Sequence, residues 1–239
     1  MDHVSCKFFG YYTPGLIMFL INNQTMRKNA WFYREKTMKK LKNNLVPEQV
    51  IGSQMDVVEE RKLSSLIQAQ EFFSAAAKRL LMVNEWGKIS GLSDFKIFAP
   101  DGTEAIRSAQ EGDFIKIDIP GPGPLSGGGF DWVKIEEIGS EHDGDQEMIS
   151  MRVRPCPSPF NQDEQTAHFL KDHATSTFTI RRDRITVWAE EHGRNEQANT
   201  DEGNVIDRAR NLIVGFSAKL GLSYPQWKLL VKGLLDGRP

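Results

Sequence analysis

Cysteine is scarce in this 239-residue sequence, in which only Cys6 and Cys156 occur, far apart in the chain. Two such residues provide neither a disulfide framework nor the paired spacing of a zinc site, so they favour a reducing compartment. The sequence also lacks a stretch of about 20 apolar residues, the length that a membrane-spanning helix requires. We therefore expect a soluble, cytoplasmic protein without a membrane span.

Motifs for common cofactors and nucleophiles are absent as well. The loop at 120–129 is rich in glycine and proline, but a strand follows it and the third glycine of a dinucleotide-binding fingerprint is missing. The acidic stretch at 136–147 lacks the glycine and the final carboxylate of a calcium loop, so we interpret it as a solvated hairpin loop. No Gly-x-Ser-x-Gly motif occurs. We predict no cofactor and no metal, and a mobile loop at 120–129.

Charge is distributed unevenly although the formal net charge is only −2. Residues 1–54 carry eight Lys and Arg against three Asp and Glu, whereas residues 55–239 carry 22 against 29. The apolar run at 16–21 is too short for a signal peptide, and a basic arm for nucleic acid or lipid remains open. We predict that 1–54 is a poorly ordered extension, or that Met55 is the true start, and that 55–239 is a single domain.

From residue 55 onward, the hydrophobic pattern predicts one helix, six strands and two further helices. Apolar residues recur at about 3.6-residue spacing over 56–83, and apolar stripes follow at 204–220 and 223–237, so these ranges are predicted helices. Alternation and turn signals predict the strands. The predicted strands are 95–99, 113–119, 130–138, 148–154, 174–181 and 184–192.

Helices and strands that are segregated along the chain indicate an α+β fold with a curved, mostly antiparallel sheet. One long helix precedes this sheet, and a C-terminal helical hairpin is expected to pack on it. The element order resembles the helix-grip arrangement, in which a curved sheet wraps around a C-terminal helix. The long strand that such an arrangement has before its first helix is not evident in the sequence.

The clearest pair of strands is the predicted hairpin at 174–192. A two-residue turn at Arg182 and Asp183 gives both strands an apolar face and a polar face, which makes the register self-consistent. A longer loop with the same parity would preserve the faces. In this register the cross-strand pairs include Phe178 with Val187, Ile180 with Ile185, and His173 with His192.

A dense group of polar residues follows where this hairpin ends, which is a common place for a site. Arg194, aided by Arg152, could hold a carboxylate or another anion. We predict a domain that binds a small molecule, with anions among the candidate ligands, and with the loop at 120–129 near the mouth of the pocket. The predicted ligand-binding residues are His173, Glu190, His192, Arg194, Asn195 and Arg152.

Two other functions remain open. His192 with Glu190 could perform acid–base chemistry in an enzyme of the hydrolase or cyclase type. Residues 205–236 resemble a helix-turn-helix, but Pro225 lies where a recognition helix would meet bases, so nucleic acid is not the expected partner. The residues identify neither the ligand nor the oligomeric state.

Overall fold

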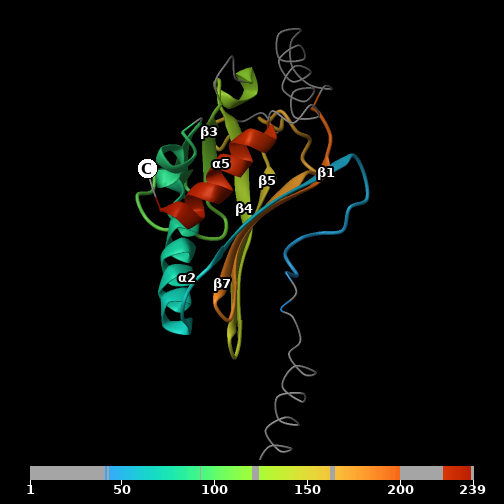
Figure 1. Cartoon of the computed structure of the whole chain (residues 1–239). Coiled ribbons are helices and arrows are strands. Elements are labelled where there is room, and N and C mark those ends of the chain that lie inside the picture. The colour runs from blue at the N-terminus through green and yellow to red at the C-terminus, as the bar shows by residue number, and fades with distance from the viewer. Residues whose placement is uncertain are drawn as a thin grey trace, which may run out of the picture. The chain divides into compact units, whose positions relative to one another are not determined.

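The computed structural model describes residues 41, 43–91, 93–119, 124–161, 165–199 and 223–237. All of them belong to the unit formed by residues 41–239 (Figure 1). Residues 1–40 lie outside the described part, so the prediction of a poorly ordered extension stays a prediction. No helix in the described ranges is both long enough and apolar enough to cross a membrane.

Seven strands form one curved antiparallel sheet in the order β1-β7-β6-β5-β4-β3-β2. The strands are β1 (Ser53–Lys62), β2 (Asp94–Phe98), β3 (Phe114–Asp118), β4 (Asp131–Asp143), β5 (Gln146–Pro155), β6 (Thr175–Asp183) and β7 (Thr186–Glu196). The helices are α2 (Leu66–Leu81), α3 (Trp86–Ser90) and α5 (Ser223–Asp236), with short 3-10 turns η1 (Val83–Glu85) and η2 (Leu125–Gly127). This is the α+β fold with helix-grip element order that the sequence predicts.

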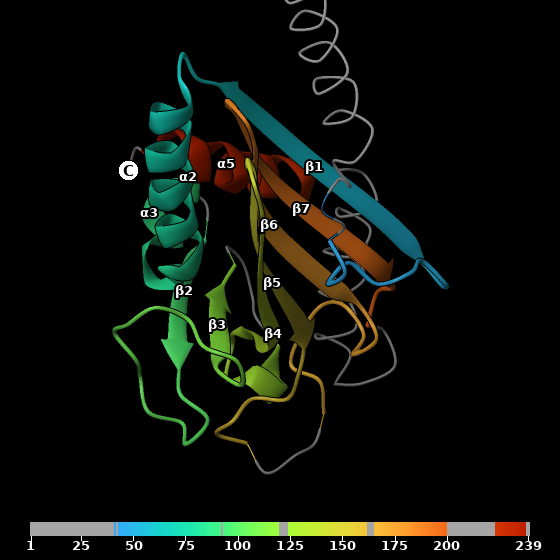
Figure 2. The same cartoon turned by 90° about the horizontal axis from the view of Figure 1, so that it is seen from below.

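Helices cover one face of the sheet (Figure 2). The helix α5 packs on β1 and β7, α2 packs on β6 and β7, and α3 packs on α5. We call this covered side the inner face, which carries Phe178 and Ile180, and the opposite side the outer face, which carries Thr177 and Thr179. The main apolar core lies between the inner face and the three helices.

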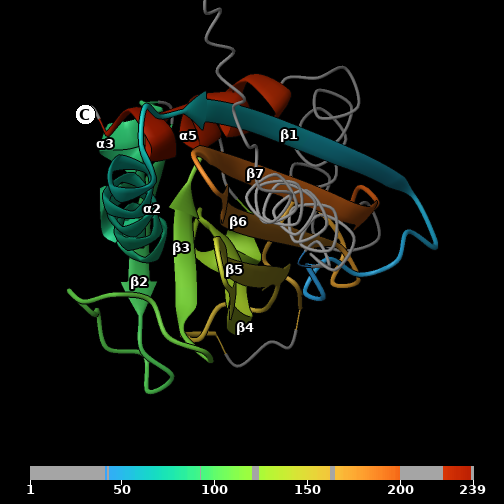
Figure 3. The ribbon, with the colours of Figure 1, turned by 60° about the horizontal axis from the view of Figure 1, so that its bottom comes forward.

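The strand β1 corrects the predicted helix at 56–83. Residues 53–62 pair with β7 along the sheet edge (Figure 3), and α2 begins only at Leu66. Ser65 caps α2 by accepting a hydrogen bond from the backbone N–H of Gln68 at 3.2 Å. In β1, Val57 is buried and Val58 is exposed, which is the two-residue period of a strand. The strand that the helix-grip arrangement requires is therefore present.

The hairpin β6–β7 has the predicted faces but different cross-strand partners. Its turn lies at Arg184 and Ile185, two residues later than predicted, so Phe178 pairs with Glu191 rather than Val187. The shift preserves parity, and Phe178 is buried as expected. The predicted pair of Ile180 with Ile185 is wrong, because Ile185 lies in the turn, is only half-buried, and Ile180 pairs with Ala189.

The remaining predicted elements fall close to their expected positions. The prediction that 136–147 is a hairpin loop is wrong. Strand β4 continues through Asp143, and only Gly144 and Asp145 form the turn. The second predicted C-terminal helix is present as α5, whereas the predicted helix at 204–220 lies outside the described residues.

Replacement of Gly233 by alanine is expected to destabilise the protein by about 1–3 kcal/mol, the usual cost of overpacking. A Cβ at Gly233 would lie 2.1 Å from Cγ2 of Ile89 and 3.0 Å from its carbonyl oxygen, where α5 crosses α3. Alanine normally favours a helix over glycine by up to about 1 kcal/mol, so a loss would show that this contact dominates. Urea unfolding measures the change, with exposed Lys232→Ala as the control; equal stability of both variants and the wild type would contradict this close packing.

Candidate functional site

A cavity opens between the inner face of the sheet and α5. Its empty volume is about 570 Å³, open solvent at its mouth included. Strands β2 to β7, the segment at 165–170 and the helices α3 and α5 contribute to it. The lining residues are Trp86, Phe95, Ile115, Ile117, Val133, Val153, Pro155, His168, Phe169, Leu170, Ala174, Thr175, Ser176, Phe178, Glu196 and Trp227.

Aromatic rings form much of the cavity wall. The Phe178 ring contacts Trp86 of α3 and Trp227 of α5, with ring centroids 4.9 Å and 5.3 Å apart. Trp86 also contacts Phe95 edge-on at 5.5 Å. Because these rings come from the sheet and from two helices, the wall is built only when α3 and α5 dock on the inner face.

Few polar side chains line this apolar space. His168 is buried and stacks on Phe169, and its Nδ1 accepts a hydrogen bond from the backbone N–H of Leu170 at 3.0 Å. Glu196 lies at the end of β7, and burial raises the pKa of its carboxyl to about 7, against the opposing charge of Arg194. A carboxyl that titrates near neutral pH inside a cavity is a candidate functional group.

Glu191 is the second acidic residue of the inner face. It is fully buried, and neither carboxyl oxygen makes a hydrogen bond of normal geometry within the described part of the chain. Burial raises its pKa well above the ordinary value, and the negative charge of Glu196 adds to this rise. The nearby hydroxyl of Ser176 opposes the rise but does not cancel it.

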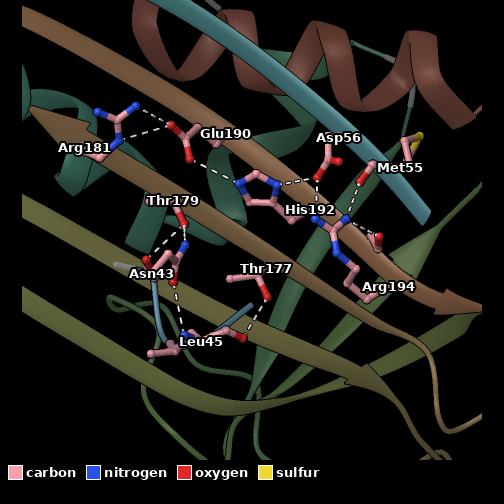
Figure 4. Close-up of polar contacts among 12 residues, drawn as sticks. Asn43, Leu45, Met55, Asp56, Thr177, Thr179, Arg181, Glu190, His192 and Arg194 are labelled. Carbon is pink, nitrogen blue, oxygen red and sulfur yellow. Dashed lines mark hydrogen bonds and ion pairs between the residues drawn. The ribbon is translucent and has the colours of Figure 1, made fainter. Parts of the chain in front are cut away.

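Three of the six residues predicted as a site, Glu190, His192 and Arg194, gather on the outer face instead (Figure 4). Arg181 donates hydrogen bonds to Glu190, whose other oxygen lies 3.1 Å from Nε2 of His192. The Nδ1 atom of His192 lies 2.5 Å from Oδ1 of Asp56, and Arg194 also donates to that oxygen at 2.7 Å. Asp56 belongs to β1, so this chain of charges joins β1 to β7 and β6.

His192 lies between two carboxylates. Burial alone would lower its pKa, but hydrogen bonds to Glu190 and Asp56 raise it above the ordinary 6.5. The pKa of Glu190 is also set by opposing effects. Burial alone would raise it, but His192 and Arg181 lower it below the ordinary value. Both ring nitrogens can donate to a carboxylate only in the imidazolium form, so the geometry favours a charged His192.

Replacement of His192 by glutamine is expected to destabilise the protein by about 1–2 kcal/mol near pH 5.5, where the imidazolium and both carboxylates are charged. The raised histidine pKa means that this contribution is complete below 6.5 and is lost as the pH rises through the folded-state value. The lowered pKa of Glu190 means that it is also lost in acid, below about 4.5. Urea unfolding across this pH range measures the difference in unfolding free energy between the wild type and His192→Gln, with exposed His142→Gln as the control. A difference that grows above neutral pH would contradict a charged His192 between two carboxylates.

The other predicted site residues are engaged elsewhere. Arg152 donates to Glu136 and Glu137 of β4, and Asn195, whose φ is +57°, holds the chain at 48–51 through its side-chain amide. His173 precedes β6 and lies 3.7 Å from Asp172, so it is not the cross-strand neighbour of His192. The structure therefore brings together Glu190, His192 and Arg194, but not the remaining three.

Residues 43–45 lie on the outer face beside this network (Figure 4). The Asn43 side chain donates to Thr179 Oγ1 at 2.6 Å, and the Leu45 carbonyl accepts hydrogen bonds from Thr177 and Arg152. These contacts satisfy threonine hydroxyls on this face that would otherwise be available to a ligand.

The sequence contained one signal for the inner-face site that the prediction did not use. Glu191 has the same strand parity as Val187 and Ala189, so a charged residue stands on an apolar face. A buried, unpaired carboxyl is costly, which makes such a position informative. Within the described ranges, no three His, Cys, Asp or Glu side chains gather closely enough to hold a metal ion.

No protein-family model and no curated protein matches the sequence. Solved structures with a similar fold include a hypothetical protein from Helicobacter pylori, which is 14% identical, with 85% of this chain and 98% of that chain covered and a TM-score of 0.45. A point mutant of norcoclaurine synthase from Thalictrum flavum is 12% identical, with 79% and 99% covered and a TM-score of 0.36. An aromatase/cyclase from Streptomyces sp. R1128 is 11% identical, with 78% and 97% covered and a TM-score of 0.35. Similarities of this size carry no argument about what this chain binds or catalyses.

Proposed function

We propose that the domain binds a small, largely apolar molecule in the cavity between the inner face of the sheet and α5. The observation that carries this proposal is the lining of the cavity, which consists mainly of aromatic and aliphatic side chains with only a few polar ones. Ligand sites in proteins typically have mostly apolar walls and a few placed polar groups.

The outer face is less suited to a ligand because its charged groups already satisfy one another. Arg194, the predicted anion clasp, donates to Asp56 and to the carbonyl oxygens of Met55 and Gly193. An anion at Arg194 would have to displace these contacts. A ligand-binding role for the outer-face cluster, or acid–base chemistry by His192 with Glu190, stays a prediction.

An enzymatic function is the second candidate, and Glu196 is the residue that favours it. A general acid or base works best when its pKa is near the working pH, and burial brings the pKa of Glu196 to about 7 at the cavity wall. A helix-turn-helix role has less support, since α5 buries Leu230, Val231 and Leu234 against the core.

The proposal can be tested with N-phenyl-1-naphthylamine, an apolar and neutral dye that fluoresces in dry pockets. We expect saturable binding to the wild-type protein. In Val153→Phe, the larger ring would enter the cavity from β5 and occupy space that the dye needs. Binding should weaken by about tenfold or more, because packing both groups into the cavity would cost about 1–3 kcal/mol. Val153 is 5% exposed and lines the cavity.

Val58→Phe is the matched control, since Val58 lies on β1 and is 51% exposed. It makes the same chemical change in a strand outside the cavity and should bind the dye as the wild type does. Absence of saturable binding to the wild type, or equal binding by both variants, would contradict the proposal.

A further inference from the structure

Two carboxyl groups converge on one point of the inner face. A Cβ at Gly193 would lie 2.5 Å from Oε1 of Glu196 and 3.6 Å from Oε1 of Glu191. The absence of a side chain at Gly193 therefore makes the space that the carboxyl of Glu196 occupies. Glu196 lines the cavity, and the carboxyl of Glu191 is close enough to interact with that of Glu196.

Glu191 lacks the partners that a buried carboxyl normally has. It is 0% exposed, lies across from Phe178 on the apolar face, and neither oxygen makes a hydrogen bond of normal geometry among the described residues. Buried polar groups in proteins are almost always satisfied, so a carboxyl whose nearest polar group is the hydroxyl of Ser176 has capacity for a further partner.

The charges around the pair do not supply that partner. Arg194 of β7 and Asp56 of β1 are the charged groups that act on Glu191 besides Glu196, and Arg194 directs its guanidinium to Asp56 and two backbone carbonyls. His168 is the other titratable group of the lining, and α5 contributes Trp227. No lysine or arginine within the described ranges lines the cavity.

We propose that Glu191 and Glu196 bind the cationic end of the ligand, so that the cavity takes a hydrophobic amine. This inference rests on the proposed function and names the chemistry of its ligand. The apolar part of the amine would lie against Phe178 and the neighbouring rings, and the ammonium group would donate to the two carboxyls.

Binding of a cation to this pair is linked to protons. Burial raises the pKa of both carboxyls, so the free cavity holds them protonated at slightly acidic pH, and an ammonium group requires an ionised carboxyl. Binding must then release a proton to solvent. For a group with a pKa of about 7, the affinity for the amine should rise about tenfold between pH 6 and pH 8.

The test compares three probes that share one ring system, namely 2-(1-naphthyl)ethylamine, 2-(1-naphthyl)ethanol and 1-naphthaleneacetate. Isothermal titration calorimetry with the full chain at pH 8 should give an affinity for the amine at least about tenfold higher than for the alcohol, the scale of one charge-assisted hydrogen bond. The carboxylate probe should bind most weakly. The affinity for the amine should rise with pH, that for the carboxylate should fall, and that for the alcohol should change little.

Glu191→Gln and Glu196→Gln remove the charge with little change in shape. Each should weaken binding of the amine by about tenfold and leave binding of the alcohol unchanged, which also shows that the variant is folded. Glu71→Gln on the exposed side of α2 makes the same substitution away from the cavity and should have no effect.

The outcomes separate the two proposals. If none of the three probes binds, both the proposed function and this inference are wrong. If the alcohol or the carboxylate binds as tightly as the amine, or if the glutamine variants keep the full affinity for the amine, the cavity binds ligands but the cation site is wrong.

Discussion

Replacement of Phe178 by alanine is expected to lower the free energy of unfolding by about 3–5 kcal/mol, as for other fully buried aromatic residues. The ring is 1% exposed and contacts Trp86 of α3 and Trp227 of α5. Its loss would leave a gap where the sheet and both helices meet, and these elements cannot all close it at once. Chemical unfolding by urea, followed by far-ultraviolet circular dichroism, measures the change.

Phe160→Ala is the control for this substitution. Phe160 is 60% exposed and contacts Phe98 and Trp132 edge-on, so its truncation should cost about 1 kcal/mol. A near-neutral result for Phe178→Ala, or equal losses in the two variants, would show that the ring of Phe178 is not enclosed between the sheet and the helices.

Replacement of Glu196 by glutamine is expected to raise the free energy of unfolding by about 3 kcal/mol at pH 8. Burial raises the carboxyl pKa from 4.5 to about 7, so between these values the unfolded chain is ionised and the folded chain is protonated. Folding then takes up a proton, and stability falls by about 1.4 kcal/mol for each pH unit in that interval. Glutamine does not titrate and avoids this loss.

Urea unfolding of the wild type and Glu196→Gln at pH 4 and pH 8 checks the sign. The gain should be small at pH 4, where the carboxyl is protonated in both states, and should reach its full size above pH 7. Glu191→Gln should change stability in the same direction, because burial also raises the pKa of Glu191. A gain that is already complete at pH 4 would point to packing rather than to ionisation.

Strand parity explains what could be predicted about the hairpin. The alternation of Phe178 and Ile180 with threonines assigned the two faces of β6 correctly, although the turn lies two residues later than predicted. Local sequence restricts the turn weakly, because Arg184 adopts a positive φ of 52° that a glycine or asparagine would have indicated more clearly. The two faces were assigned correctly because the predicted turn was displaced by an even number of residues, which preserves strand parity.

For strand β1, in contrast, the hydrophobic pattern led to a wrong prediction. Val58, Leu63 and Leu66 happen to recur with helical spacing, and their run continues into the true helix α2. The charges at Glu59, Glu60 and neighbouring positions hide the alternation of an edge strand, which proteins commonly protect in this way. Only pairing with β7, more than 120 residues later in the chain, reveals the strand.

For the candidate site, the sequence predicted which polar residues share a face but not which face a distant helix covers. Glu190, His192 and Arg194 do lie together, and they bind one another and Asp56 of the unrecognised strand β1. The cavity depends on where α5 docks, which is a long-range outcome of packing. A ligand role for the outer-face residues therefore stays a prediction, while the cavity gives the better-supported proposal.

The most direct test of the central claim is a crystal structure of the protein in complex with N-phenyl-1-naphthylamine. We expect density for the dye between Phe178, Val153 and Trp227, inside the cavity under α5. Density over Glu190 and His192 on the outer face, with an empty cavity, would contradict it.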